Sequence, residues 1–263
     1  MTSAPVVIKL GGELVETPER LAAVGEALAG LAATGPLVVV HGGGREIDIE
    51  LARRGVARQA VDGLRITDPD SLAAVISVLA GTINTRLVAH LVTIGLPAVG
   101  VTGVDAAVGR SSRAAAHVTA AGAQVDLGQV GEPRPDADLG LIRHLLAGGF
   151  VPVVASLGIG GSGEILNVNA DTLAAHVAAG IAAGQLLLAG GTEGVLDAEG
   201  RTIRELTSSA AGSLMRDGTA SAGMIAKLRA ATSARARGVS DVWIVDGRSA
   251  AALHDRCGTR VLA

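Results

Sequence analysis

The fold of this chain is decided by its first apolar stretch, Val6-Val7-Ile8-Lys9-Leu10-Gly11-Gly12. The β-branched run predicts a buried strand, and the two glycines let the backbone that leaves it lie close to a ligand. Lys9 places a positive charge beside those bare backbone amides. This combination is typical of the start of a phosphate-binding site.

Lysine is rare in this sequence, which has 22 basic residues but only two lysines, Lys9 and Lys227. The guanidinium group of arginine is a wide planar fork. A lysine ammonium is a compact point charge, which suits one phosphoryl oxygen in a narrow site. Because both lysines stand near glycines, we favour a functional role for both over two chance surface lysines.

Composition limits the possible function classes. The chain has 263 residues, of which 49% are apolar, so it can bury a sizeable core. Its net charge of -3 gives no basic field for nucleic acid or an anionic membrane. Residues 1–5 show no leader pattern, and no apolar stretch approaches the ~20 residues of a membrane span. We expect a cytoplasmic protein with neither nucleic acid nor membrane as a partner, and the single cysteine, Cys257, excludes an internal disulfide.

Strand and helix patterns alternate along almost the whole chain. Apolar β-branched runs predict strands at 6–10, 37–40, 97–103, 150–154, 185–188 and 242–245. Helical periodicity predicts helices at about 18–34, 46–54, 69–87, 136–146, 171–183, 206–216, 223–237 and 250–256. Residues 105–135 lack periodicity and suggest hairpins over the site. We predict an α/β fold, a three-layer sandwich with a mostly parallel central sheet that two lobes share.

Three glycine-rich segments could hold a nucleotide triphosphate. They are Gly11-Gly12 after the first strand, Gly42-Gly43-Gly44 after the second, and the helix start that runs from Gly223 to Lys227. The P-loop motif and the protein-kinase motifs are absent from the sequence. Ligands of parallel sheets gather beyond the carboxyl ends of the strands, so we expect these segments to meet at one cleft.

Other polar residues allow two interpretations each. Asn167-Val168-Asn169-Ala170-Asp171 is either a helix N-cap cluster or a set of groups that bind substrate and orient the lysines. Arg65 is either a solvated arginine or a fork for a substrate carboxylate. For His41 we favour a hydrogen-bonded structural ring over a general base. The remaining histidines show no metal-ligand spacing, so no residue is assigned to a metal.

The order of motifs resembles the amino acid kinase family, and within it most closely the acetylglutamate kinases. The motifs are Lys-x-Gly-Gly, His-Gly-Gly-Gly, Gly-Leu-Arg-Ile-Thr-Asp, Asn-Val-Asn-Ala-Asp and Gly-Met-Ile-x-Lys, and they cover essentially the whole chain. The resemblance implies ATP-dependent phosphorylation of the γ-carboxylate of N-acetyl-L-glutamate to an acyl phosphate, the second step of arginine biosynthesis. It also implies that ATP carries Mg²⁺ into the site.

The resemblance assigns roles to individual residues. Lys9 and Lys227 would neutralise the transferred phosphoryl group, Asp171 would orient both lysines, and Gly12 would donate a backbone amide. Substrate would contact Gly43, Gly44, Arg65 and Asn167. Nucleotide would contact Gly191, Thr192, Gly194, Leu196, Thr219, Ala220 and Ser221. Residues 1–165 would form the lobe for the amino-acid substrate and dimerisation, and residues 166–263 the nucleotide lobe.

One segment departs from the family pattern. Leu188-Ala189-Gly190-Gly191-Thr192-Glu193-Gly194 has an extra residue and lacks the aspartate that relatives usually carry, which predicts a looser nucleotide pocket. Two alternatives therefore stay open. One is a kinase with another acceptor, such as LysW-linked aminoadipate, carbamate or fosfomycin; the other is a catalytically weakened binding or regulatory module.

The resemblance also bears on assembly. Only five residues precede the first strand, whereas relatives that form arginine-inhibited hexamers carry an added N-terminal helix. The apolar stripe of the predicted helix at 69–87 suits a partner surface as well as the sheet. We therefore expect a homodimer.

Overall fold

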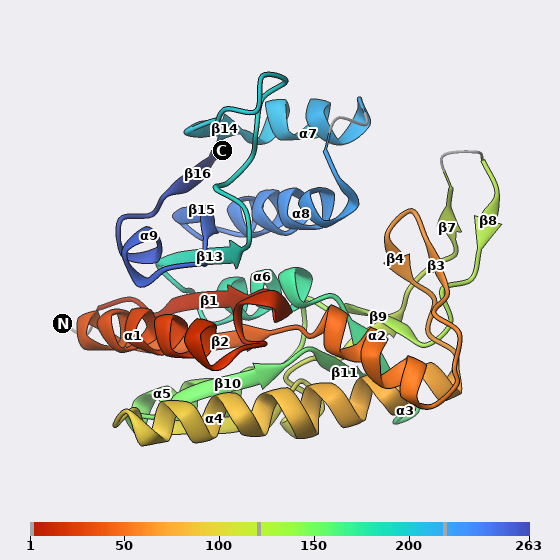
Figure 1. Cartoon of the computed structure of the whole chain (residues 1–263), viewed down its shortest axis with the longest axis horizontal. Helices are drawn as coiled ribbons and strands as arrows, with labels where there is room; N and C mark the ends of the chain where they lie inside the picture. Colours follow the sequence, from red (N-terminus) through yellow and green to blue (C-terminus); the bar gives the residue numbers. More distant parts are fainter. Residues whose placement is uncertain (1–2, 120–121, 218–219) are drawn as a thin grey trace.

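A central eight-stranded sheet organises the computed structural model, which describes residues 3–119, 122–217 and 220–263 (Figure 1). The strand order is β14-β16-β15-β13-β1-β2-β10-β5. The strands are β1 (Val6–Leu10), β2 (Leu37–His41), β5 (Ala98–Thr102), β10 (Val151–Ala155), β13 (Gln185–Gly190), β14 (Glu205–Thr207), β15 (Asp241–Asp246) and β16 (Gly258–Leu262). Neighbouring strands run parallel except β15 and β16. The predicted mostly parallel sheet is confirmed.

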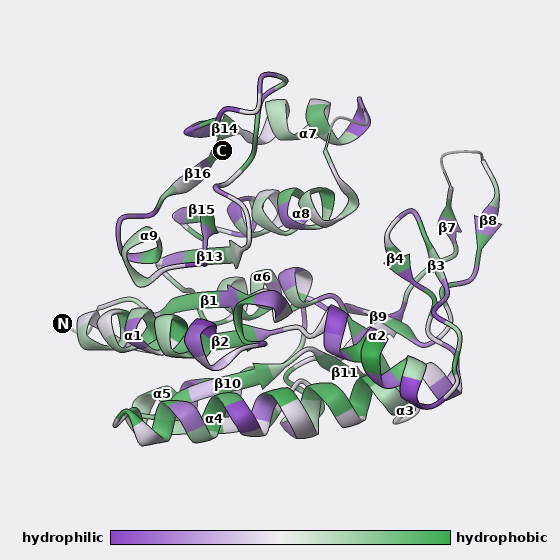
Figure 2. Ribbon diagram, in the orientation of Figure 1, coloured by the Kyte–Doolittle hydropathy of each residue, from purple (hydrophilic) through white to green (hydrophobic). Residues whose placement is uncertain are grey.

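The sheet is covered on both faces, which makes three layers. One face packs against α5 (Gly140–Ala147), α6 (Ala170–Gly180), α7 (Ser208–Arg216) and α8 (Ala222–Ala236). The other packs against α1 (Pro18–Thr34), α2 (Gly44–Arg53), α3 (Pro69–Ile76), α4 (Asn84–Thr93) and α9 (Ala250–His254). Because both faces of the central strands are buried, these strands are mostly apolar, as Figure 2 shows, and Lys9 in β1 is a buried exception.

Strand alternation decides where Lys9 points. In β1, Val7 belongs to the core under α6 and α8, whereas Ile8 and Leu10 belong to the opposite core. Successive side chains of a strand point to opposite faces, so Lys9 lies on the same face as Val7. The sequence of β1 thus directs the lysine toward the N-terminal ends of α6 and α8.

Two helices begin as their capping residues predict. Thr17 caps α1, and its hydroxyl accepts a hydrogen bond from the Arg20 amide at 3.3 Å. Asp68 caps α3 by accepting one from the Ser71 amide at 2.8 Å. Both helices have a proline in the first turn, where a missing N–H leaves nothing unpaired.

The helix that starts at Pro69 continues through a π-helical stretch (Ser77–Ile83) to the end of α4 at Thr93. The helix has 25 residues, and an 18-residue window of it has a mean hydropathy of 1.6, so it is long and apolar enough to cross a membrane. The expectation that no apolar stretch approaches that length was wrong. A core helix passes the same test, and 44% of its apolar window is buried within the protein. The buried Asn84 donates to the Val153 carbonyl of β10 at 2.9 Å, which ties this helix to the sheet.

A smaller layer lies beyond the carboxyl ends of the central strands (Figure 1). It contains a four-stranded sheet of β11 (Leu157–Ile159), β12 (Ile165–Val168), β9 (Val130–Pro133) and β6 (Ser111–Arg113). Two hairpins extend from it, β3 (Ala60–Val61) with β4 (Leu64–Arg65), and β7 (His117–Val118) with β8 (Gln124–Val125). The hairpins predicted within residues 105–135 are confirmed.

Some element boundaries differ from the sequence-based expectation. Helix α5 begins at Gly140 rather than at about residue 136, because the Asp138 side chain accepts the Gly140 amide at 2.9 Å and forms a turn before the helix. Strand β16 was not predicted. It pairs closely with β15, and a Cβ on Gly258 would lie 2.1 Å from the Ile244 carbonyl oxygen, so only glycine fits there.

Candidate active site

A cleft of about 530 Å³ lies at the carboxyl ends of β1, β2 and β13. All three predicted glycine-rich segments line it, together with the N-terminal ends of α2, α6 and α8. The β3–β4 hairpin reaches across it: Gly63, at φ +77°, approaches α8 so closely that a Cβ would lie 2.1 Å from the Ala222 Cβ. The predicted meeting of the glycine segments at one cleft is therefore confirmed.

Both lysines of the chain contact one carboxylate. The Lys9 Nζ lies 3.1 Å from Asp171 Oδ1, and the Lys227 Nζ lies 3.3 Å from the same oxygen. All three side chains are buried: that of Lys9 is 7% exposed, that of Lys227 is 12% exposed and that of Asp171 is 7% exposed. Asn169 is the N-cap of α6, since its side chain accepts the Thr172 amide, and Asp171 is thereby free to face the lysines.

The three charged groups shift one another's pKa values. Burial alone would raise the pKa of Asp171, but the charges of Lys9 and Lys227 outweigh it and lower that pKa. Burial also opposes the charge of Lys9, yet Asp171 holds its pKa above the usual value. For Lys227, burial and the neighbouring Lys9 charge lower the pKa to about 8 despite Asp171. Two ammonium groups therefore share one carboxylate, and Lys227 gives up its proton first.

The glycines allow two backbones to touch. A Cβ on Gly12 would lie 2.9 Å from the Gly43 Cα, and a Cβ on Gly43 would lie 2.3 Å from Ile83 Cδ1. Gly43 is the N-cap of α2 and, like any glycine, offers no capping side chain. The first amides of α2, beginning at Gly44, are thus available to an anion in the cleft.

Arg65 is not an ordinary solvated arginine. Its side chain is 15% exposed, and its Nη2 donates to Asp48 Oδ1 at 2.5 Å and to the Gly44 carbonyl at 3.2 Å. Its Nη1 is buried without a hydrogen-bond partner among the described residues. Asn167 also lines the cleft, and its side-chain amide donates to Thr67 Oγ1 at 3.1 Å. The guanidinium group therefore retains a donor for a ligand, as the fork interpretation requires.

The residues predicted for the nucleotide separate into two groups. Gly191, Thr192 and Ser221 line the cleft, and Ser221 also caps α8. The remaining described ones do not line it: Gly194 packs against Thr259, Leu196 is 47% exposed, and Ala220 packs on the apolar core. Thr219 lies outside the described residues.

His41 has the structural role that we favoured. Its ring is fully buried, its Nδ1 lies 3.2 Å from the Gly42 carbonyl oxygen, and its Nε2 lies 3.1 Å from Asn84 Nδ2. Burial lowers the pKa of His41 to about 4, so the ring is neutral at pH 7. A neutral ring that ties β2 to the long helix fixes the start of the Gly42-Gly43-Gly44 segment.

Two carboxylates in the cleft were missed. Asp48 holds Arg65, and Glu13 accepts a hydrogen bond from the Gly191 amide at 3.0 Å. Both contacts join segments far apart in the chain, so no local pattern could reveal them; the only signal for Glu13 is its place directly after Gly11-Gly12. No group of three His, Cys, Asp or Glu residues that could hold a metal occurs among the described residues.

The sequence matches the amino acid kinase family over residues 4–246. The chain belongs to this family. A relative named acetylglutamate kinase from Chloroflexus aurantiacus is 41% identical over 257 residues, which cover 97% of this chain and 95% of that protein. Another from Aromatoleum aromaticum is 40% identical over 92% of this chain and 82% of its own length. The family resemblance inferred from the motifs, and with it the identification as a kinase, is confirmed.

Solved structures place this amino acid kinase in the same fold. A protein of Streptococcus mutans UA159 matches with a TM-score of 0.82 and 27% identity over 98% of both chains. An N-acetylglutamate synthase from Neisseria gonorrhoeae matches with a TM-score of 0.83 and 24% identity over all of this chain and 60% of that one. A carbamate kinase from Giardia lamblia matches at 17% identity and a TM-score of 0.68. The last two similarities establish the fold alone.

Proposed function

We propose that this amino acid kinase transfers the γ-phosphoryl group of ATP to the γ-carboxylate of N-acetyl-L-glutamate and forms an acyl phosphate. The observation that carries the proposal is the pair of buried lysines on one carboxylate, beside two glycine segments that line the same cleft. The full-length relatives named acetylglutamate kinase support the choice of acceptor.

The acceptor needs no general base. A carboxylate with a pKa near ~4.3 is already ionised at neutral pH, so its oxygen attacks phosphorus directly. The neutral, buried His41 does not line the cleft, which agrees with a reaction that removes no proton from the acceptor. Catalysis then consists of bringing two anions together and stabilising the charge on the transferring group.

The residues divide this task. Lys9 and Lys227 neutralise the phosphoryl oxygens as these leave ADP for the acceptor, while Asp171 fixes the position of both ammonium groups. The amide of Gly12 donates to the same group. The unpaired Nη1 of Arg65 binds the α-carboxylate of the substrate, and Asn167 and the amides at Gly43 and Gly44 bind its acetylamino part.

Magnesium bound to ATP would neutralise part of the triphosphate charge. The cleft fits such an ion, because it offers an exposed carboxylate oxygen on Glu13. We assign residues 1–165 to the amino-acid substrate and dimerisation, and residues 166–263 to the nucleotide. We expect the protein to be cytoplasmic and to form a homodimer. The exposed apolar side chains of Val92, Ile94 and Phe150, near edge strand β5 and the long helix, support the dimer.

The pH dependence follows from Lys227. Its folded pKa of about 8 means that it is protonated below pH 8 and loses its charge above it. We expect kcat/KM for ATP to fall about tenfold per pH unit above pH 8. Bound phosphate stabilises the ammonium form, so the fall in kcat should come at higher pH. Initial rates measured from pH 6 to 10 check this; a flat kcat/KM up to pH 10 would exclude a required Lys227 ammonium.

Acceptor identity is tested with MgATP, a panel of acids and hydroxylamine, which traps acyl phosphates as hydroxamates. We expect a strong signal with N-acetyl-L-glutamate. Free glutamate should give a much weaker one, because its ammonium replaces the neutral amide and is left unpaired in the cleft. N-acetylaspartate is one methylene shorter and should misplace its nucleophilic oxygen by more than ~1 Å.

The same assay addresses the alternatives. ATP consumption without any hydroxamate would reject the carboxylate acceptor and favour a carbamate or phosphonate. If the protein binds ATP but never hydrolyses or transfers it, the alternative of a catalytically weakened binding module, which the altered Leu188–Gly194 segment suggested, is favoured. Retention of both lysines and Asp171 in one buried cluster favours the enzyme.

A further inference from the structure

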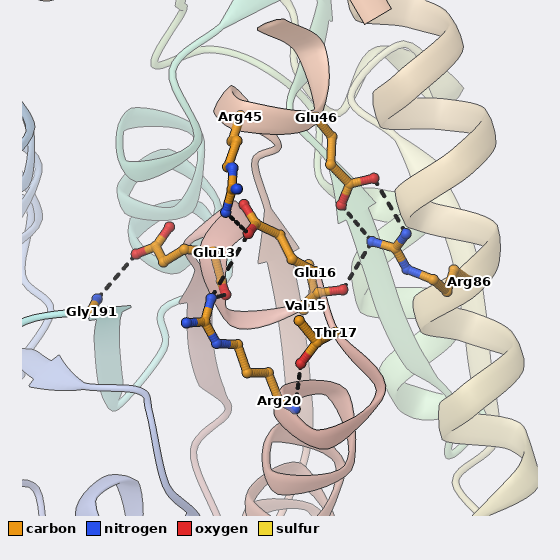
Figure 3. Close-up of polar contacts among 9 residues, drawn as sticks. All are labelled: Glu13, Val15, Glu16, Thr17, Arg20, Arg45, Glu46, Arg86 and Gly191. Atoms are coloured by element: carbon orange, nitrogen blue, oxygen red, sulfur yellow. Dashed lines mark hydrogen bonds and ion pairs between the residues drawn. The ribbon is translucent and has the colours of Figure 1, made fainter. Parts of the chain in front are cut away.

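The carboxylate of Glu13 lines the cleft, and its one role in the proposed reaction is as an oxygen that suits the magnesium ion of ATP. Glu13 follows Gly12 in a short 3-10 helix (Gly12–Leu14), and its Oε1 accepts a hydrogen bond from the Gly191 amide at 3.0 Å (Figure 3). The contact joins the loop after β1 to the loop after β13. A carboxylate from the first lobe therefore stands at the segment where the expected aspartate is missing.

The position of Glu13 is close to the phosphate-binding lysines. A Cβ placed on Gly190 would lie 3.5 Å from Glu13 Oε1 and 3.6 Å from Lys227 Nζ, so both charges flank the same point. The Glu13 charge also contributes to the raised pKa of Lys9. A triphosphate held by the two lysines must therefore pass close to this carboxylate.

Glu13 differs from the other acidic groups of the cleft. Among the described residues, the carboxylates lining it are Glu13, Asp48 and Asp171. Asp171 is paired with both lysines, and Asp48 with Arg58 and Arg65. Glu13 forms no ion pair within the part of the chain that the structure describes. Among the carboxylates of the cleft that the structure describes, Glu13 is thus the one without a cation in direct contact.

The backbone around Glu13 is fixed by arginines, which Figure 3 shows converging on residues 13–16. Arg20 Nη1 donates to the Glu13 carbonyl at 2.8 Å, and Arg86 Nη2 donates to the Val15 carbonyl at 2.9 Å. Glu46 in turn holds Arg86 through a contact of 2.6 Å. The carboxylate is therefore presented by an anchored segment rather than by a free surface side chain.

An unbalanced carboxylate beside a triphosphate has opposite effects on two forms of ATP. It repels the metal-free nucleotide, whereas it attracts a Mg²⁺ ion, which favours carboxylate oxygens together with substrate phosphates as ligands. We propose that Glu13 is a protein ligand of the Mg²⁺ that ATP carries and makes the cleft selective for magnesium-bearing nucleotide. The inference rests on the proposed function, because it requires a triphosphate in this cleft.

The test compares the wild type with Glu13→Gln by calorimetric titration of AMPPNP, a non-hydrolysable ATP analogue, with and without Mg²⁺. Glutamine has nearly the same shape, and its carbonyl can still accept the Gly191 amide, so the loops should keep their positions. We expect the variant to bind metal-free AMPPNP more tightly and Mg-AMPPNP more weakly. The Kd of metal-free AMPPNP divided by the Kd of Mg-AMPPNP should therefore be at least ~10-fold smaller in the variant than in the wild type.

Two further variants serve as controls. Glu13→Asp keeps the charge on a shorter arm and should retain part of the preference. Glu50→Gln removes one negative charge from α2 at a residue that pairs with Arg54 and does not line the cleft, and should leave the ratio unchanged. An unchanged ratio in Glu13→Gln, or an equal fall in Glu50→Gln, would overturn the Glu13 role alone. A wild-type chain that binds neither form would overturn the proposed function itself.

Discussion

Replacing either Lys9 or Lys227 by arginine is expected to lower kcat at least ~100-fold, although the positive charge is kept. Both side chains are almost fully buried against Asp171, so the wider guanidinium cannot occupy the position of the ammonium without displacing its neighbours. A donor misplaced by about an ångström no longer meets the transferring oxygens, and the loss appears at the transition state.

The measurement is steady-state kcat at saturating ATP and acceptor, with circular dichroism to verify folding. Arg54→Lys provides the matched control, since it exchanges the same two cations in a surface pair with Glu50 and should leave kcat unchanged. If Lys9→Arg or Lys227→Arg turned over within about twofold of wild type, a catalytic role for that lysine would be rejected.

The cluster of the two lysines and Asp171 could be anticipated because each member belongs to a local pattern. Lys9 lies near the end of a strand, Lys227 follows a helix start, and Asp171 occupies the first turn of α6. Parallel strands bring their carboxyl ends to one edge of the sheet, so residues at such ends meet even when they are distant in sequence. Periodicity together with this rule was sufficient to place the cleft.

The contacts that join the segments around the cluster could not be anticipated. Asp48 reaches Arg65, Asn84 reaches His41, and Glu13 reaches Gly191, each across separate elements. Nothing in the residues next to Asp48 or Asn84 distinguishes them from other polar residues on helix surfaces. Such contacts depend on side-chain geometry after the helices have packed, which a single sequence does not encode in any short pattern.

The segment after β13 shows the limit of motif comparison. Without an aspartate there, the sequence predicts a looser nucleotide pocket, and this stays a prediction; in the structure the Glu13 carboxylate accepts a hydrogen bond from the Gly191 amide of that segment. The two nucleotide candidates that follow it, Gly194 and Leu196, lie outside the lining of the cleft. An insertion in a turn changes the alignment of the residues that follow it, so the nucleotide roles of Gly194 and Leu196 stay predictions.

Replacing Asp171 by asparagine is expected to lower kcat at least ~100-fold and to destabilise the fold by about 3 kcal/mol. The substitution leaves Lys9 and Lys227 side by side without a counter-charge, and two buried ammonium groups then repel each other. In the free enzyme at neutral pH one of them should lose its proton, which lowers kcat/KM. In the complex with ATP neither ammonium group is held in place for the transferring oxygens, which lowers kcat. The fall in kcat/KM with rising pH should accordingly begin below pH 8.

Binding and turnover should separate in this variant. An incoming triphosphate supplies the negative charge that Asp171 no longer provides, so KM for ATP should stay the same or fall while kcat collapses. Asp241→Asn is the control: Asp241 pairs with Arg260 and accepts from Trp243 away from the cleft, so its loss should reduce stability and leave kcat intact. Urea unfolding and initial rates on both variants give the comparison. A kcat for Asp171→Asn within about fivefold of wild type would mean that the lysines hold their positions without it, and the orienting role of Asp171 would have to be abandoned.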